Sequence, residues 1–396
     1  DDIGAAAESE ASKLLSEEEE MLIIQRLHRV LRPFLLRRTK DMVLKDLPER
    51  REVVIWTPLS AWQAQLYNEG LSARHAKGGA GIFDLARLRQ SLNHPYHFLE
   101  GEVPAAGSSD DRLVSASGKF EFLDRVLPRL ISFGHKTLIF AQMTGLLDLL
   151  QLLLARLGIR YSRIDGGMSL RQRMTSAAVF QKDPMVGVLL LTTRAGGLGL
   201  NLQVADTVVL FDSDWNPQVD FQAMDRAHRI GQQKPVLVVR LATPTHLDRG
   251  LLERAGQKID MEQKVISAGR FFGDCQKTAA RGEDGSKEEQ GFLRRLIADA
   301  RRRPSASVAA RGAGATPIEE ASRLLARSPE ERAAFEAADL EMLGPAGTGD
   351  GGSAEGAAQR LERCGRLMAT SDLRSLKRAA TTTASSRRAL KRRRSD

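Results

Sequence analysis

The chain has 396 residues, of which 42% are hydrophobic and 28% charged, as is typical of a globular protein of two or three domains. Its two cysteines are too few for a disulfide framework or a cysteine-based zinc site, so a reducing compartment is expected. No apolar run reaches the roughly 20 residues of a membrane-spanning helix, and the acidic first residues lack the pattern of a signal peptide.

The net charge of +9 is concentrated near the end of the chain. Residues 374–396 contain nine basic residues and one acid, so they carry eight of the nine net charges. The rest is nearly neutral, and the overall charge therefore does not indicate that the folded part binds nucleic acid. We predict that the basic run at 387–394 serves nuclear import or loose nucleic-acid binding.

In chain order, an acidic segment at 1–20 comes first. A linking and helical region follows at 21–117. In it, apolar residues at 21–36 have helical spacing, VVIW at 53–56 is a strand candidate, and residues 59–99 are mainly helical in pattern. A polar linker rich in Gly and Ser, at 101–117, ends this region.

Residues 118–245 alternate apolar runs with helical stretches. We predict strands at 137–141, 161–164, 186–191, 208–211 and 236–241, with helices at 145–156 and 169–181. Repeated strand–helix alternation indicates a parallel sheet with helices on both faces. The fold class is therefore α/β, flanked by helical segments.

Beyond that domain the pattern changes twice. Residues 246–303 are expected to be helical, with helices at 246–268 and 288–303. Residues 304–396 are of low complexity and basic, and aromatic residues almost disappear from them. We predict that they are mostly disordered, because so little apolar surface cannot offset chain entropy.

Two clusters in the α/β domain could bind an anion. Gly196, Gly197 and Gly199 follow a buried strand, where ligands collect at the carboxyl edge of parallel sheets. Arg226 and Arg229, expected on one face of a helix, suit a polyphosphate. A tight turn without ligand and a solvated helix face remain the alternatives.

Other candidates are weaker. Trp215 lies in a turn of Asp, Asn and Pro, where contact with a binding partner is the alternative to simple packing. The SGK string at 117–119 lacks the remaining residues of a phosphate loop and is rejected. His94, His97 and His135 have no metal-ligand spacing, so we assign them structural roles.

Several strings together resemble one family: RTKDMVLKDLPER, NHPYHF, SGKFEFLDRVLP, LIFAQMT, TTRAGGLGLNL and FDSDWNPQVDFQAMDRAHRIGQ. They are similar to the second RecA-like lobe of superfamily 2 helicase-related ATPases, in particular of the SWI/SNF chromatin remodellers of the Brahma type. The resemblance covers roughly residues 21–270, so 21–117 would contain the inter-lobe link. Residues 255–303 resemble, more weakly, the post-helicase histone-anchoring segment, after the brace helices at 246–268.

The resemblance implies a role for each matching residue. Arg226 and Arg229 would be arginine fingers for the γ-phosphate of ATP held by a first lobe. Gln222, Gly197 and Gly199 would form the nucleotide side of this lobe and couple it to DNA. The implied DNA contacts are Thr193, Arg194, Trp215, Arg163 and Arg173.

The sequence lacks a GxxxxGK[ST] loop and an Asp-Glu pair after a strand, so ATP and Mg²⁺ would be bound mainly by a first lobe outside this chain, and we predict no metal site here. The implied function is the second ATPase lobe of a DNA translocase that remodels nucleosomes in the nucleus. Its implied partners are double-stranded DNA, histones, the first lobe and remodelling-complex subunits, and no membrane. The alternatives are a non-catalytic DNA- or histone-binding adaptor and a recombination translocase of the same superfamily.

Overall fold

The computed structural model describes residues 47–72, 82–97, 111–193, 200–267 and 315–343. The strands are β1 (Arg50–Trp56), β2 (Thr137–Ala141), β3 (Arg160–Ile164), β4 (Val186–Thr192), β5 (Thr207–Leu210) and β6 (Val236–Ala242). The helices are α3 (Ala61–Ser72), α4 (Ile82–Asn93), the short η3 (Pro95–His97), α5 (Arg112–Ser115), α6 (Gly118–Ser132), α7 (Thr144–Arg156), α8 (Leu170–Lys182), α9 (Pro217–Met224), α10 (His246–Ser267), α14 (Ile318–Leu325) and α15 (Pro329–Leu343).

The chain forms two compact units. The larger unit combines Leu47–Leu251 with Ile297–Asp396, and the sheet and all sites below belong to it. The second unit combines Asp1–Asp46 with Leu252–Leu296, of which the structure describes residues 252–267 of α10. The predicted acidic segment at 1–20, the predicted helices at 21–36 and 288–303, and the basic run at 387–394 lie outside the described residues.

Six strands form a single sheet in the order β1-β6-β5-β2-β4-β3, and every neighbouring pair is parallel. The predicted α/β class is therefore confirmed. The five strands predicted within 118–245 are all present, and each predicted boundary is met within one residue.

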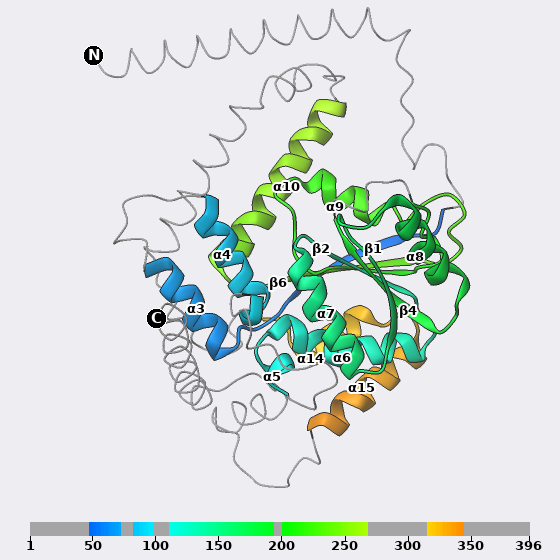
Figure 1. Ribbon diagram of the computed structural model, residues 1–396, viewed down its shortest axis with the longest axis horizontal. Coiled ribbons are helices and arrows are strands. Elements are labelled where there is room, and N and C mark those ends of the chain that lie inside the picture. Colours follow the sequence, from blue (N-terminus) through cyan, green and yellow to red (C-terminus); the bar gives the residue numbers. More distant parts are fainter. Residues whose placement is uncertain (1–46, 73–81, 98–110, 194–199, 268–314, 344–396) are drawn as a thin grey trace, which may run out of the picture. The chain divides into compact units, whose positions relative to one another are not determined.

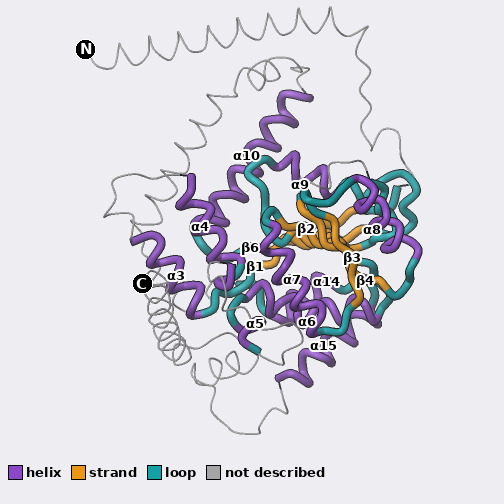
Figure 2. The backbone as a smooth tube through the Cα atoms, in the orientation of Figure 1, coloured by secondary structure: helices purple, strands orange, loops and turns teal. Residues whose placement is uncertain are grey.

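Helices cover both faces of the sheet, as predicted. Side chains of a strand point alternately to its two faces, so on β2 Ile139 and Ala141 enter one apolar cluster while Leu138 and Phe140 enter the other. The first cluster is closed by α6, α7, α14 and α15, and the second by α8 and α9. Figures 1 and 2 show the strands between α8 and α9 on one side and α6, α14 and α15 on the other.

The sheet begins earlier in the chain than we predicted. The candidate strand at 53–56, which we placed in the linking region, extends to Arg50–Trp56 and pairs with β6 over seven residues as an edge strand. Residues 47–72 and 82–97 consequently belong to the same compact unit as the predicted domain at 118–245. The partner strand β6 lies almost 190 residues further along the chain, and this separation hid the pairing in the sequence.

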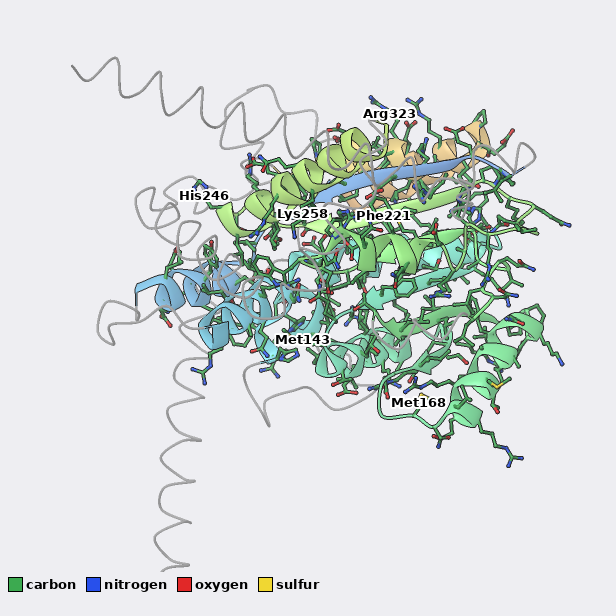
Figure 3. All side chains as sticks on the ribbon, turned by 90° about the horizontal axis from the view of Figure 1, so that it is seen from above. Met143, Met168, Phe221, His246, Lys258 and Arg323 are labelled. Atoms are coloured by element: carbon green, nitrogen blue, oxygen red, sulfur yellow. The ribbon has the colours of Figure 1, made fainter. Side chains whose placement is uncertain are left out.

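Part of the segment 304–396, which we predicted to be mostly disordered, has a described structure. Within it, residues 315–343 form α14 and α15 and pack against the sheet. The Thr316 N–H donates to the Trp56 carbonyl oxygen at 2.8 Å, and the Trp56 N–H donates to Thr316 Oγ1 at 2.9 Å. Figure 3 shows α14, which carries the labelled Arg323, alongside β1.

Buried polar contacts explain why so few apolar residues hold these two helices in place. Arg129 of α6 forms an ion pair with Asp339 of α15 at 2.7 Å, and both side chains are largely buried. Phe335, the last phenylalanine of the chain, is 1% exposed and meets Phe133 edge to face. Composition alone did not show these pairs, because their partners lie about 200 residues away.

A second polar cluster joins α15 to the start of β5. His135 Nδ1 lies 2.9 Å from Asp206 Oδ2, and His135 Nε2 lies 2.9 Å from Glu331 Oε1. Arg327 adds an ion pair with Asp206 Oδ1 at 3.1 Å. We call His135, Asp206, Arg327 and Glu331 the His135 cluster. It gives His135 the structural role that we predicted.

Candidate functional site

The carboxyl ends of the central strands bring several predicted residues to one edge of the sheet. The Thr193 N–H donates to the Ala141 carbonyl oxygen at 3.1 Å, directly beyond β4 and β2. The Phe211 N–H donates to the Phe140 carbonyl oxygen at 2.9 Å. Phe211 directly follows β5 and precedes the turn that contains Trp215. Thr193 and the Trp215 turn therefore follow strands that flank β2 on either side.

The turn around Trp215, residues 212–216, is fixed by hydrogen bonds at each of its polar residues. Asp212 Oδ1 accepts from the Gln142 N–H at 3.0 Å, and Asp214 Oδ1 accepts from the Asn216 N–H at 2.9 Å. Asn216 then caps α9 by accepting from the Gln218 N–H at 3.1 Å. Trp215 is half-buried. The turn therefore presents a preorganised indole at the sheet edge.

Three residues that the sequence did not indicate, Arg240, Gln142 and Arg89, donate hydrogen bonds to Ser213 of this turn. Ser213 Oγ accepts from Arg240 Nη1 at 2.9 Å, and the Ser213 carbonyl oxygen accepts from Gln142 Nε2 at 2.7 Å and from Arg89 Nη2. Gln142 lies in the LIFAQMT string and Arg89 precedes NHPYHF. These strings carried the family resemblance, but nothing in them indicated that both would converge on Ser213.

A buried ion-pair network anchors α9 behind the turn. Arg240 of β6 pairs with Asp220 of α9 and, at 2.8 Å, with Glu52 of β1. Burial raises the pKa of Asp220 to about 6, although the charge of Arg240 opposes that rise. Breaking a buried pair of this kind costs on the order of 3–5 kcal/mol. The network thus connects β1, β6 and α9.

Lys119 of the SGK string is buried inside the fold. Its side chain is 2% exposed, and Nζ donates to Asn93 Oδ1 and to the Phe211 carbonyl oxygen, each at 2.9 Å. Asn93 Nδ2 donates in turn to Asp212 Oδ2 at 3.1 Å. Burial lowers the pKa of Lys119, against the attraction of nearby carboxylates. The amine therefore supports the Trp215 turn and does not hold a phosphate.

Arg226 and Arg229 lie just beyond α9 and not on a helix as we predicted. The helix ends at Met224, and the chain continues in tight turns in which the Arg226 N–H donates to the Ala223 carbonyl oxygen at 3.2 Å. Burial lowers the pKa of Arg226, and the positive charge of Arg229 lowers it further.

The charge of Asp225 offsets part of the positive charge of this arginine pair. Arg226 Nε is buried and has no hydrogen-bond partner among the described residues. Arg229 is exposed, and its Nη1 donates to Asn201 Oδ1 at 2.8 Å. Gln222 is exposed on the last turn of α9. An anion bound between Arg226 and Arg229 would accept hydrogen bonds from both guanidinium groups and relieve the repulsion between them.

The two predicted arginines near β3 already form hydrogen bonds within the protein. Arg163 donates to Asp165 Oδ2 at 2.8 Å and to Asp148 Oδ1 at 2.5 Å. Burial alone would lower the pKa of Arg163, but the two carboxylates raise it above its ordinary value. Arg173 Nη2 donates to the Gly166 carbonyl oxygen at 2.9 Å and closes the turn that contains the labelled Met168 in Figure 3. Both arginines therefore shape the turn before α8.

Some predicted features are not represented at the site. Arg194, Gly196, Gly197 and Gly199 lie outside the described residues. In the described part of the chain, no three His, Cys, Asp or Glu side chains group as ligands of a metal ion. Nor does any helix there have the length and apolar character needed to cross a membrane.

Comparison with known proteins assigns the chain to a family. The helicase conserved C-terminal domain matches residues 118–231, and the SNF2-related domain matches residues 6–97. The chain belongs to the SNF2-related family. The helicase match begins at α6 and ends beyond the Arg226–Arg229 turns, so it contains strands β2 to β5 and the arginine pair.

Relatives of this SNF2-related chain include SWI/SNF proteins. The nuclear protein STH1/NPS1 of Saccharomyces cerevisiae is 43% identical over 344 residues, which cover 83% of this chain and 24% of that protein. The SWI/SNF chromatin-remodeling complex subunit snf22 of Schizosaccharomyces pombe is 45% identical over 296 residues, covering 72% and 17%. The chain thus spans about a quarter or less of the length of these two relatives.

One solved structure with a similar backbone is the Sulfolobus solfataricus SWI2/SNF2 ATPase core in complex with double-stranded DNA. It is 27% identical, with 62% of this chain and 52% of that chain covered, and the TM-score is 0.47. At that TM-score the likeness adds nothing to the family assignment, which rests on the two domains and the relatives.

Proposed function

We propose that this chain supplies the second ATPase lobe of an ATP-dependent DNA translocase that remodels nucleosomes. The observation that carries the proposal is the Arg226–Arg229 pair beyond α9, with a buried guanidinium nitrogen that has no partner among the described residues. The pair lies in the helicase domain match, and two relatives are named as a SWI/SNF subunit and a nuclear protein.

In this proposal the arginines act on ATP that a first lobe holds. Charge accumulates on the γ-phosphate oxygens during phosphoryl transfer, and a positioned guanidinium stabilises it. Such a finger contributes on the order of 10³ to 10⁵ in rate. We propose that the first lobe also binds Mg²⁺, since the sequence has neither a GxxxxGK[ST] loop nor an Asp-Glu pair after a strand.

The DNA side of the proposed lobe lies at the carboxyl edge of the sheet. Thr193 would contact a DNA phosphate and Trp215 would lie against the duplex, together with Arg194, which is outside the described residues. Helix α9 joins the Trp215 turn to the arginine pair, and its eight residues span about 12 Å. A short, anchored helix between the two places suits mechanical coupling of DNA contact to hydrolysis.

The other two predicted DNA contacts are less direct. Arg163 would have to leave Asp148 and Asp165 to reach a phosphate, and Arg173 holds the Gly166 carbonyl. We therefore propose that both position the turn before α8 for DNA. Histones, remodelling-complex subunits and a nuclear location are proposed from the names of the relatives.

Complementation tests the proposal. The chain alone should release phosphate only at background rate, because its sequence has no phosphate loop or Asp-Glu pair. The chain joined behind the first lobe of a SWI/SNF relative should hydrolyse ATP when DNA is added. DNA binding by the chain should weaken steeply with salt, since phosphate contacts release counterions.

Two results would contradict the proposal. DNA-stimulated hydrolysis by the chain alone would refute the half-site assignment. A joined protein that binds ATP and DNA but does not hydrolyse ATP would favour the non-catalytic adaptor instead.

A further inference from the structure

Helix α4 reaches the Trp215 turn from a part of the chain more than 100 residues earlier. Arg89 and Asn93 are four residues apart and so lie on one face of α4. Arg89 Nη2 donates to the Ser213 carbonyl oxygen, and Asn93 Nδ2 donates to Asp212 Oδ2 at 3.1 Å. Two successive residues of the turn are thus held by one helix.

Arg89 also contacts the indole itself. Its guanidinium carbon lies 5.6 Å from the centroid of the Trp215 ring, within the range of a cation–π interaction. The Arg89 residue is 7% exposed, so water screens this contact little. Burying a charge in this way is costly unless its contacts compensate. An apolar residue could fill the same space, but it could not hold a carbonyl and a ring together.

We propose that Arg89 is a positioning residue that sets the orientation of Trp215 for DNA contact. Its guanidinium fixes the backbone of the turn at Ser213 and one face of the indole at the same time. The DNA part rests on the proposed function above, whereas the orientation of the indole can be measured without DNA. Arg89 lies outside the helicase domain match at 118–231.

The chain contains a matched control for this contact. It has three tryptophans, Trp56, Trp62 and Trp215. Arg249 lies over the ring of Trp56 at 5.3 Å, a distance like that between Arg89 and Trp215. Labelling the full chain with 5-fluorotryptophan gives three fluorine resonances, which substitution of each tryptophan by phenylalanine assigns.

Each arginine should then control its own tryptophan. Arg89→Gln should shift the Trp215 resonance and leave Trp56 in place, and Arg249→Gln should do the reverse. Arg89→Lys keeps the charge but lacks the planar fork, so it should give a smaller shift of Trp215 in the same direction. Should Arg89→Gln fail to fold, Arg89→Lys gives the same readout with the buried charge retained.

Duplex DNA separates this proposal from the proposed function. DNA should shift the Trp215 resonance of the unaltered chain, and Arg89→Gln should weaken DNA binding about three- to tenfold, because an indole that is no longer held must be ordered when DNA binds. A Trp215 resonance that is indifferent to both Arg89 variants would overturn the positioning role. A resonance that responds to Arg89 but not to DNA would support the positioning role and contradict the DNA contact.

Discussion

Substitution of Asp206 tests whether the His135 cluster holds α14 and α15 against the sheet. Burial alone would raise the pKa of Asp206, but the hydrogen bond from His135 and the charge of Arg327 lower it from 3.8 to about 2. Each pKa unit corresponds to 1.36 kcal/mol, so the ionised carboxylate stabilises the fold by about 2 kcal/mol. Asp206→Asn should lower the free energy of unfolding at pH 7 by at least that amount.

The sign of the pH dependence follows from the lowered pKa. Stability contributed by Asp206 is complete above about pH 4 and is lost as the pH falls towards 2. Urea unfolding from pH 7 to pH 2 should therefore show the difference between the unaltered chain and Asp206→Asn shrinking below pH 4.

A matched control is Asp111→Asn. Asp111 also forms an ion pair, with Arg156 at 2.8 Å, but its side chain is 68% exposed. An exposed pair contributes about 0–1 kcal/mol. Equal losses for the two variants, or a loss for Asp206→Asn that persists unchanged at pH 2, would refute the reasoning.

Two further predictions concern the region that supports the Trp215 turn. Burial lowers the pKa of His94 to about 4, so the neutral ring should contribute roughly 3 kcal/mol above pH 6.5 that is lost between pH 6.5 and 4. An NMR titration of the His94 ring should have its midpoint near 4; a midpoint near 6.5 would contradict this. Gly118→Ala should destabilise the fold by more than about 3 kcal/mol, because the new Cβ would lie 1.9 Å from the Pro58 carbonyl oxygen. Gly166→Ala, which meets nothing within 4 Å, should change thermal stability by less than about 0.5 kcal/mol; similar losses for both would refute the steric explanation.

Local patterns were sufficient to predict much of the fold. Four of the five strands within 118–245, namely β2, β4, β5 and β6, are short, mainly apolar runs whose residues are all buried. The signal that fixes the start of α8 is also local, since Ser169 caps the helix in a capping box with Gln172. Such signals depend on residues that are near in sequence.

Long-range pairing could not be predicted in the same way. The seven-residue ladder between β1 and β6 joins residues almost 190 positions apart. The ion pair of Arg129 with Asp339 spans a similar distance, and it places α15 where composition indicated disorder. Nothing near either partner in the sequence indicates the other.

The candidate site was only partly predictable for the same reason. Arg226, Arg229 and Trp215 came from their motif, yet the residues that hold the Trp215 turn come from α4, β6 and the end of β2. The helix predicted to carry the two arginines ends at Met224, after which the chain forms turns. Motifs indicated which residues act, and tertiary contacts determine how they are held.

The most direct test of the central claim is the effect of Arg229→Ala on the protein joined to a first lobe. DNA-stimulated turnover should fall by about 10³-fold or more, while ATP affinity stays within about threefold. Arg229→Lys should fail as well, because an ammonium cannot replace the planar fork. Arg332→Ala, which removes an exposed arginine of α15, should leave turnover unchanged. DNA-stimulated turnover that survives Arg229→Ala would contradict the assignment of Arg229 as a finger and the half-site on which the account depends.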